Sequence, residues 1–310
     1  MAKIPLPTCS TYDMLVVGAS NAGLSAALVL GRARRRVLVL DGGPPRNAPA
    51  FHTHSFFTRD GAAPRQVLGI GREQLRPYPV EVCALEAQQA ALTPAGVALT
   101  LTGGTVVTAA ALVLATGVSD ELPAVPGLAA LWGRGVYHCP YCHGWENRYG
   151  RVVVYGRGEA GYQQAVLLHH WCSRLSLCTD GPAGLTPAQR THLAALGVTI
   201  LEAPVAALDG SLKCLRAIEF DDGHREPVDA VFLRPAQRQR SSLAAQLGCA
   251  FTADGVYVQV NETGLTSVPG VYAVGDMTGP FQQAILAAAS GTRAAAALNN
   301  ELIFRDSVAV

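Results

Sequence analysis

The stretch Gly18-Ala19-Ser20-Asn21-Ala22-Gly23 decides the fold expected for the first part of this chain. The apolar run 12–17 before it predicts a buried strand, and residues 24–30 after it carry apolar side chains at helical spacing. A second apolar run, 36–40, ends at Asp41, at the separation of about 20 residues typical of a dinucleotide-binding βαβ unit. This layout predicts a pyrophosphate at the helix N-terminus and ribose hydroxyls on the acid.

Ser20 stands where the Gly-x-Gly-x-x-Gly pattern has its middle glycine. A serine is small enough to let a phosphate approach the backbone, so the departure weakens the pattern without abolishing it. The alternative is that these glycines form an ordinary turn between a strand and a helix and bind no nucleotide. An ordinary turn does not explain why strand, turn, helix and acid all occur in order. The residues predicted to bind the nucleotide are Gly18, Ser20, Asn21, Ala22, Gly23 and Asp41.

A second glycine turn, Gly156-Arg157-Gly158-Glu159-Ala160-Gly161, repeats this layout in the middle of the chain. It follows the apolar run 151–155 and precedes a predicted helix over 163–171, and Asp180 comes after the next predicted strand. Near the C-terminus, a strand over 270–274 runs into Gly275-Asp276, before an Ala-rich helix predicted over 282–298.

These blocks predict an α/β protein with two Rossmann-like nucleotide-binding domains, the second inserted in the first. Alternation further predicts antiparallel strands at 80–82 and 97–102. The predicted division is 1–118 and 246–310 for the first domain and 119–245 for the inserted one.

The composition agrees with this class and disfavours several others. Hydrophobic residues make up 49% of the chain and charged residues 15%, as expected for buried parallel strands. A net charge of +1 with no extended basic run disfavours nucleic acid as a partner, and no apolar stretch is long enough to predict a membrane span. Without a signal peptide and with six of the eight cysteines scattered, we expect a cytoplasmic protein.

The stretch His138-Cys139-Pro140-Tyr141-Cys142-His143 carries the chemistry. Proline is favoured at the first position of a helix, which places Cys139 near the N-cap and Cys142 in the first turn. Amide dipoles and a nearby imidazolium lower the pKa of a thiol there, as disulfide exchange requires. A c-type haem attachment site, a zinc site and an inert pair of buried cysteines are the alternatives.

Other candidate residues receive simpler interpretations. The remaining cysteines are expected to be small buried hydrophobes. His52 and His54 could reach the flavin or the substrate from their loop, but solvated loop histidines are the simpler expectation. The aromatic residues expected in the core rather than at a substrate pocket are Phe51, Phe56, Phe57, Tyr141 and Trp145.

Taken together, these motifs resemble the low-molecular-weight thioredoxin reductase family along nearly the whole chain. The match rests on the first glycine turn, Ala115-Thr116-Gly117, the Cys-x-x-Cys of the inserted domain, and Val274-Gly275-Asp276 followed by Gln282-Gln283-Ala284. The resemblance implies FAD as cofactor, three-layer ββα domains and a homodimer. It adds to the predicted cofactor-binding residues Thr116, Gly117, Gly275, Asp276, Gln282, Gln283 and Ala284.

Cys139-Pro140-Tyr141-Cys142-His143-Gly144 resembles one branch more closely, the FAD-dependent dithiol oxidases that close disulfides in natural products such as gliotoxin, holomycin and romidepsin. The branch implies a small dithiol and O₂ as reactants and H₂O₂ as product. By this resemblance Cys142 faces the flavin and Cys139 exchanges with the substrate. His143 replaces the acid of the reductases, so we favour it over His138 as the acid/base.

Residues 178–182 lack the arginine pair with which similar reductases bind the 2′-phosphate of NADPH, and Asp180 would repel that phosphate. We therefore expect that NADPH is not used. Binding of NADH to Asp180 stays open, as do two other functions for the chain. These are an NAD(P)H-dependent disulfide reductase and a flavin-binding redox sensor without turnover.

Overall fold

The structure, a computed structural model, describes residues 6–211 and 214–308, the side chains of 306–308 excepted. The chain forms two compact units. The first unit contains the residues up to Ala48, Phe56–Ser119 and those from Gln237 onward, and the second contains Pro49–Ser55 and Asp120–Ala236. None of the described helices offers an apolar stretch long enough to cross a membrane.

The first unit is built on a sheet whose parallel part has the order β3-β2-β1-β6-β17. β6 is its longest strand, and its later residues pair in parallel with β17, while its first residues pair antiparallel with β5. β5 in turn pairs with β4. The strands of this sheet are β1 (Thr11–Val17), β2 (Val37–Leu40), β3 (Val80–Cys83), β4 (Ala87–Thr93), β5 (Gly96–Leu101), β6 (Val106–Leu114) and β17 (Val271–Ala273).

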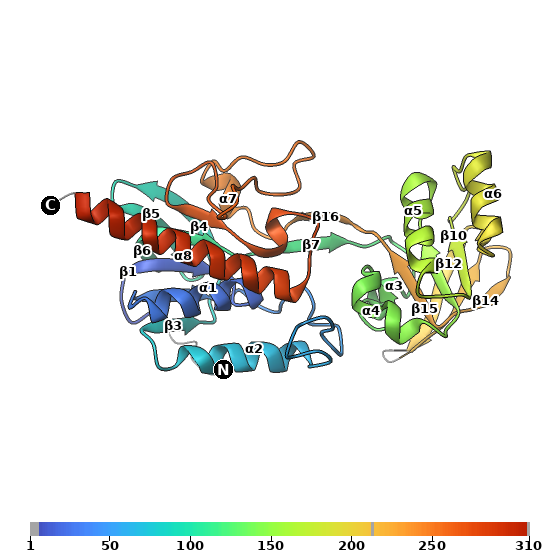
Figure 1. Ribbon diagram of the computed structural model, residues 1–310, viewed down its shortest axis with the longest axis horizontal. Helices are drawn as coiled ribbons and strands as arrows, with labels where there is room; N and C mark the ends of the chain where they lie inside the picture. Colours follow the sequence, from blue (N-terminus) through green and yellow to red (C-terminus); the bar gives the residue numbers. More distant parts are fainter. Residues whose placement is uncertain (1–5, 212–213, 309–310) are drawn as a thin grey trace. The chain divides into compact units, whose positions relative to one another are not determined.

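Helices α1 (Asn21–Arg32), α2 (Pro64–Leu75) and α8 (Ala284–Val308) form the helical layer of this unit (Figure 1). Met14 and Val16 of β1 pack in one buried cluster with Leu298 of α8. The opposite face of the sheet, with Leu15, packs against the β4–β5 hairpin and α7 (Leu243–Gln246). The unit therefore has the predicted three-layer ββα arrangement.

The second unit repeats this architecture around the parallel sheet β11-β10-β9-β15-β8. One face packs against the helical layer and the other against the antiparallel sheet β12-β13-β14, so the two cores lie on opposite sides of one sheet. Its strands are β8 (Val136–Tyr137), β9 (Val152–Tyr155), β10 (Leu175–Cys178), β11 (Thr199–Leu201), β12 (Val205–Ser211), β13 (Cys214–Phe220), β14 (Arg225–Pro227) and β15 (Ala230–Leu233). Its helices are α3 (Leu128–Leu131), α4 (Pro140–Asn147), α5 (Gly158–His169) and α6 (Pro187–Ala195).

The chain passes between the two units through β7 (Val118–Glu121) and β16 (Ala236–Gln239), which pair as a two-stranded sheet. The division differs from the predicted one at three places, the smallest being Ser119, which belongs to the first unit. Residues 237–245 belong to the first unit, because Leu243 and Ala244 are buried in its core. Residues 49–55 belong to the second unit, where Arg134 Nε donates to Pro49 O at 3.0 Å.

Two expectations about strands need correction. β3 is not part of an antiparallel pair: it lies parallel to β2, with Val80 opposite Val37. The antiparallel partner of β5 is β4, which the sequence pattern missed because Ala87–Thr93 lacks the branched and aromatic side chains that mark strands. A strand of low intrinsic preference forms here because its neighbour supplies the hydrogen bonds.

The expected burial of several cysteines and aromatic residues is also wrong. Cys9, which precedes β1, and Cys214, the first residue of β13, are exposed, whereas the other unbonded cysteines are buried. Tyr141 and Trp145 are 60% and 64% exposed, because residues four apart share a helix face and here Pro140 and Gly144 face inward. Phe51 and Phe57 are exposed in a loop and Phe56 is half-buried.

Candidate active site

The first glycine turn is shaped for a closely approaching anion. Gly18 has φ +112°, and a Cβ there would lie 2.2 Å from Ala115 O, so no other residue fits. A Cβ on Gly23 would lie 1.8 Å from Gly18 O, which lets α1 begin directly against the strand end. Ser20 is the N-cap of α1 and makes no side-chain cap, and the first turn holds no acid. These N–H groups and the positive end of the helix fit the pyrophosphate of FAD.

The other residues predicted from the same motifs occupy compatible places. Asp41 follows β2, where its Oδ2 accepts from Arg72 Nη2 at 2.6 Å. Gly117 has φ +70°, and Thr116 Oγ1 donates to Met277 Sδ at 3.5 Å, which ties the end of β6 to the Gly-Asp segment. Asn21 and Ala22 are the first two residues of α1, and Ala284 is the first residue of α8.

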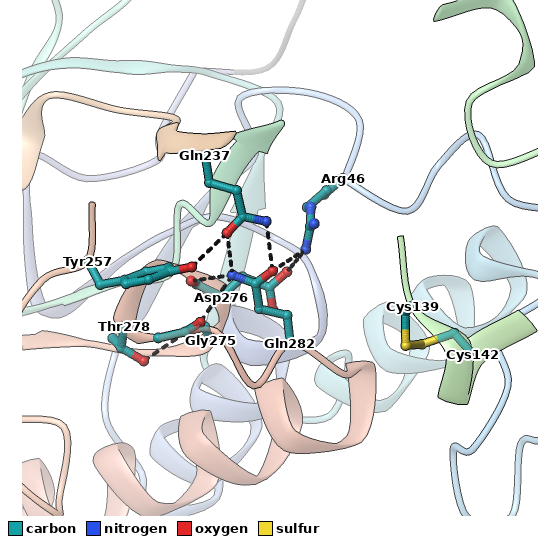
Figure 2. Close-up of polar contacts among 10 residues, drawn as sticks. Arg46, Cys139, Cys142, Gln237, Tyr257, Gly275, Asp276, Thr278 and Gln282 are labelled. Atoms are coloured by element: carbon teal, nitrogen blue, oxygen red, sulfur yellow. Dashed lines mark hydrogen bonds and ion pairs between the residues drawn. A yellow bond between two sulfur atoms is a disulfide. The ribbon is translucent and has the colours of Figure 1, made fainter. Parts of the chain in front are cut away.

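A polar cluster surrounds Asp276, on the 3₁₀ turn η1 (Gly275–Thr278) (Figure 2). Asp276 Oδ2 accepts from Arg46 Nη1 at 3.1 Å, and the same nitrogen donates to Gln282 Oε1 at 2.7 Å. Gln282 Nε2 donates to Gln237 Oε1 at 2.9 Å, which also accepts from Tyr257 OH at 2.8 Å. The cluster thus fixes the segment between Gly275 and α8, where the resemblance places the flavin.

Sequence reasoning found Asp276 and Gln282 but missed three members of this cluster, Arg46, Gln237 and Tyr257. Arg46 lies in an irregular loop and Gln237 in a connecting strand, far from both motifs in sequence. No periodicity marks them. In the fold, the half-buried Arg46 is the charged partner of the half-buried carboxylate of Asp276.

Replacing Arg46 with methionine should lower the free energy of unfolding by about 1–3 kcal/mol, because Asp276 would lose a charged hydrogen bond in a half-buried place. Thermal unfolding of the flavin-free protein would measure this. The matched control is Arg76→Met, whose ion pair with Glu73 is mostly exposed and should contribute little. Equal effects of the two substitutions would show that the cluster is not a stabilising element.

The two cysteines of the second unit form a disulfide at the start of α4 (Figure 2). Pro140 is the first residue of the helix and Cys139 is its N-cap in an extended conformation, as the sequence predicts. Cys142 N and His143 N both point at Cys139 O, each at 3.2 Å. Both cysteines are half-buried, so this pair is neither a core contact nor fully exposed. Helix N-terminal amides stabilise a thiolate that forms when such a bond opens.

His143 lies one residue after this disulfide and is held from two sides. Its ring stacks on Tyr137 of β8 with centroids 4.2 Å apart, and its carbonyl accepts from Asn147 Nδ2 at 2.7 Å. Nδ1 is fully enclosed and has no hydrogen-bond partner among the described residues. Burial, followed by the charges of His54 and His52, lowers the pKa of His143 to about 4. His143 is therefore neutral at neutral pH and able to take up a proton.

Two further histidines lie near His143, on the loop segment 49–55, which the sequence favours as solvated. His54 lies edge-on to His143, with ring centroids 6.4 Å apart, and its Nε2 is 3.6 Å from Glu146 Oε1. His52 stands behind His54 at 5.9 Å. His138, by contrast, stacks on Trp132 at 5.8 Å. The structure thus brings His54, with His52 behind it, to the side of His143.

The second glycine turn is occupied by its own side chains. Asp180 Oδ2 accepts from Tyr155 OH at 2.7 Å, and its Oδ1 accepts from Val205 N at 2.8 Å. Arg157 crosses the turn, donating to Asp180 O at 2.8 Å. Both carboxylate oxygens that a ribose would need are therefore bonded within the unit. Gly161 keeps the close packing of the motif, since a Cβ there would lie 2.7 Å from Gly156 O.

This chain is similar to known proteins over nearly its whole length. The family model described as pyridine nucleotide-disulphide oxidoreductase matches residues 12–291. Thioredoxin reductase sirT of Leptosphaeria maculans is 30% identical, with 98% of this chain and 98% of that protein covered. Thioredoxin reductase aclD of Aspergillus oryzae is 28% identical, with 94% and 97% covered. The crystal structure of HlmI superposes with a TM-score of 0.92 at 36% identity, covering 98% of this chain and 96% of that one.

Proposed function

This chain belongs to the pyridine nucleotide-disulphide oxidoreductase family, and from that premise we propose that it is an FAD-dependent dithiol oxidase closing a disulfide in a small molecule. One observation carries the proposal. The second unit holds a helix-capping disulfide beside a neutral histidine, while its nucleotide turn is closed by Arg157 and Asp180. The disulfide and its histidine can take electrons from a dithiol, and the side chains at the nucleotide turn disfavour NADPH as the electron donor.

The exchange begins with deprotonation of a substrate thiol, whose proton passes to neutral His143. The resulting thiolate attacks Cys139 Sγ, the Cys139–Cys142 bond breaks, and Cys142 leaves with the electron pair as a thiolate. The second substrate thiol attacks the substrate sulfur of the mixed disulfide, and its proton passes to the Cys139 sulfur, which leaves as a thiol. This closes the product disulfide and releases Cys139, so two electrons have moved from the substrate to the cysteine pair. Bound FAD would take these electrons and pass them to O₂, giving H₂O₂.

The N-terminus of α4 favours this direction of electron flow. Cys142 N lies in the first turn, so a thiolate at Cys142 forms at the positive end of a helix dipole. A thiolate beside His143 also favours the imidazolium, because opposite charges a few ångströms apart stabilise each other. The proton taken from the substrate is therefore held best while Cys142 is reduced, and it is given up when the disulfide closes again.

NADPH has no complementary site at the second glycine turn. The 2′-phosphate would meet the carboxylate of Asp180, and the side chain of Arg157 is engaged with the backbone of the same residue. Arg157 is exposed, so it could be displaced, but Asp180 is held by Tyr155 and Val205. We therefore propose a small dithiol as the electron donor, with a homodimer in the cytoplasm as the expected form.

Anaerobic stopped-flow spectra of the flavoprotein test this proposal. A small dithiol such as dithiothreitol should bleach the flavin, and admission of air should restore the colour with about one H₂O₂ per disulfide formed, as two-electron balance requires. NADPH and NADH should leave the flavin oxidised on the same timescale. Bleaching by NADPH within milliseconds would instead identify a reductase, and no response to either donor would identify a sensor without turnover.

A further inference from the structure

The segment 49–55 is distant in sequence from the disulfide but packs beside it in the second unit. Several contacts hold this segment in place. Pro49 O accepts from Arg134 Nε at 3.0 Å, the Arg134 guanidinium lies 5.2 Å from the centre of the Phe51 ring, and Ser55 Oγ donates to Tyr141 O at 3.5 Å. Tyr141 lies between the two cysteines, so the segment is attached to the redox turn itself.

These contacts place His54 near both His143 and Glu146, which lie three residues apart on α4. His54 presents its edge to His143 and directs Nε2 toward Glu146 Oε1 at 3.6 Å, the distance of an ion pair when the imidazole is protonated. Only 18% of the His54 side chain is exposed, whereas Glu146 is 39% exposed and reaches solvent. His54 is thus the more enclosed member of a pair whose outer member faces water.

The groups facing His143 come from three elements. Tyr137 of β8 stacks on the ring, and its phenol has a raised pKa because of burial and then Glu146, so it stays neutral. The disulfide cysteines on α4 carry no charge while they are bonded. His54 and His52 of the segment 49–55 also act on His143, because the charge of each lowers its pKa.

We propose that His54, paired with Glu146, is a positioning residue that adds to burial in opposing protonation of His143 while the Cys139–Cys142 disulfide is closed. The physical reason is repulsion: a positive charge on His54 opposes a second proton on the neighbouring ring. When the disulfide opens, the thiolate at Cys142 offsets that repulsion, and His143 can hold the proton of the substrate thiol. Proton uptake is thereby linked to the redox state of the cysteines.

The part that His54 plays in turnover rests on the proposed function. Its effect on the protonation of His143 can be tested without turnover. The titration of His143 can be followed by NMR of the imidazole C–H signals in the oxidised protein, without a dithiol or turnover. In the parent protein the midpoint should lie at about pH 4. In His54→Gln it should move to higher pH by about one unit, because the neighbouring charge is lost. His224→Gln, an exposed histidine of the same unit, is the matched control and should leave it unchanged.

Two further variants separate charge from packing. His54→Arg keeps a cation that can pair with Glu146, so it should hold the His143 midpoint near the parent value. Should His54→Arg instead behave like His54→Gln, burial alone would explain the low midpoint and the role given to the charge of His54 would be wrong. Glu146→Gln tests whether the pairing with Glu146 holds His54 in place. By releasing His54, it should raise the His143 midpoint as His54→Gln does. An unchanged midpoint would show that Glu146 has no part in the proposal.

The pH dependence of dithiol oxidation gives an independent measurement. Because His143 must be neutral to accept a proton, kcat/KM should fall as pH drops below its pKa in the oxidised enzyme. The acid limb should therefore lie at higher pH in His54→Gln than in the parent or in His54→Arg. An unmoved acid limb alongside a shifted NMR midpoint would mean that His143 is not the proton acceptor. Absence of oxidation in all forms, with the NMR shift present, would refute the proposed function and leave the His54–His143 coupling intact.

Discussion

Cys142→Ser should lower the rate of dithiol oxidation by about 10³-fold or more, the scale of loss when an essential nucleophile is removed. A serine cannot form the disulfide with Cys139 or leave as a thiolate, so the electron pair of the substrate has no acceptor at α4. Cys139→Ser should be equally inactive, because the sulfur that the substrate attacks is gone. Oxygen consumption with dithiothreitol as substrate measures both variants.

Cys9→Ser is the matched control, since Cys9 is exposed and unbonded in the first unit. It should keep the parent rate. All three variants should also retain flavin, because Cys139 and Cys142 belong to the second unit and the first glycine turn to the other. Turnover by Cys142→Ser within tenfold of the parent would mean that electrons reach the flavin without the cysteine pair.

Gly23→Ala should cause a large loss of bound flavin. Its Cβ would lie 1.8 Å from Gly18 O and 3.2 Å from Val16 Cγ1, so α1 must move away from the strand end. Such overpacking destabilises a core by about 1–3 kcal/mol. Since 1.4 kcal/mol is about tenfold in a binding constant, the FAD affinity should fall by about tenfold or more. Flavin content after gel filtration and thermal unfolding of the apoprotein measure the two effects.

Gly69→Ala offers a control on a neighbouring helix of the same unit. Gly69 is within α2, and a Cβ there would meet nothing within 4 Å. Alanine is the better helix former by about 0.5–1 kcal/mol, so this variant should be slightly more stable and fully loaded with flavin. If both variants retain flavin equally, the close contact of α1 with the strand end is not needed for binding.

Much of the fold could be predicted from the sequence because its signals are local. A buried parallel strand needs only a short apolar run, and a glycine turn needs only small residues where backbones touch, as at Gly18 and Gly23. The capping of α4 by Cys139 follows from Pro140, whose ring fixes a helix start. β4 was missed because its own preference is weak and its pairing is supplied by β5.

The surroundings of the site depended on contacts between distant segments. His54 looked like a solvated loop residue, and only the packing of residues 49–55 against α4 places it beside His143 and Glu146. In the same way, only folding brings Tyr155 and Val205 to the two carboxylate oxygens of Asp180. Neither contact leaves a periodic trace in the chain.

The two ββα units, the helix start at Cys139 and the family resemblance are predictable from the amino-acid sequence, because each depends on neighbouring residues or on a short motif. The contacts of these motifs with distant segments are seen only in the folded chain: Arg46 with Asp276, Arg157 with Asp180 and His54 with His143. The physical reason is that a side chain's charge, burial and hydrogen bonds are set by groups that folding brings within a few ångströms. Sequence order does not specify that proximity for residues in irregular loops.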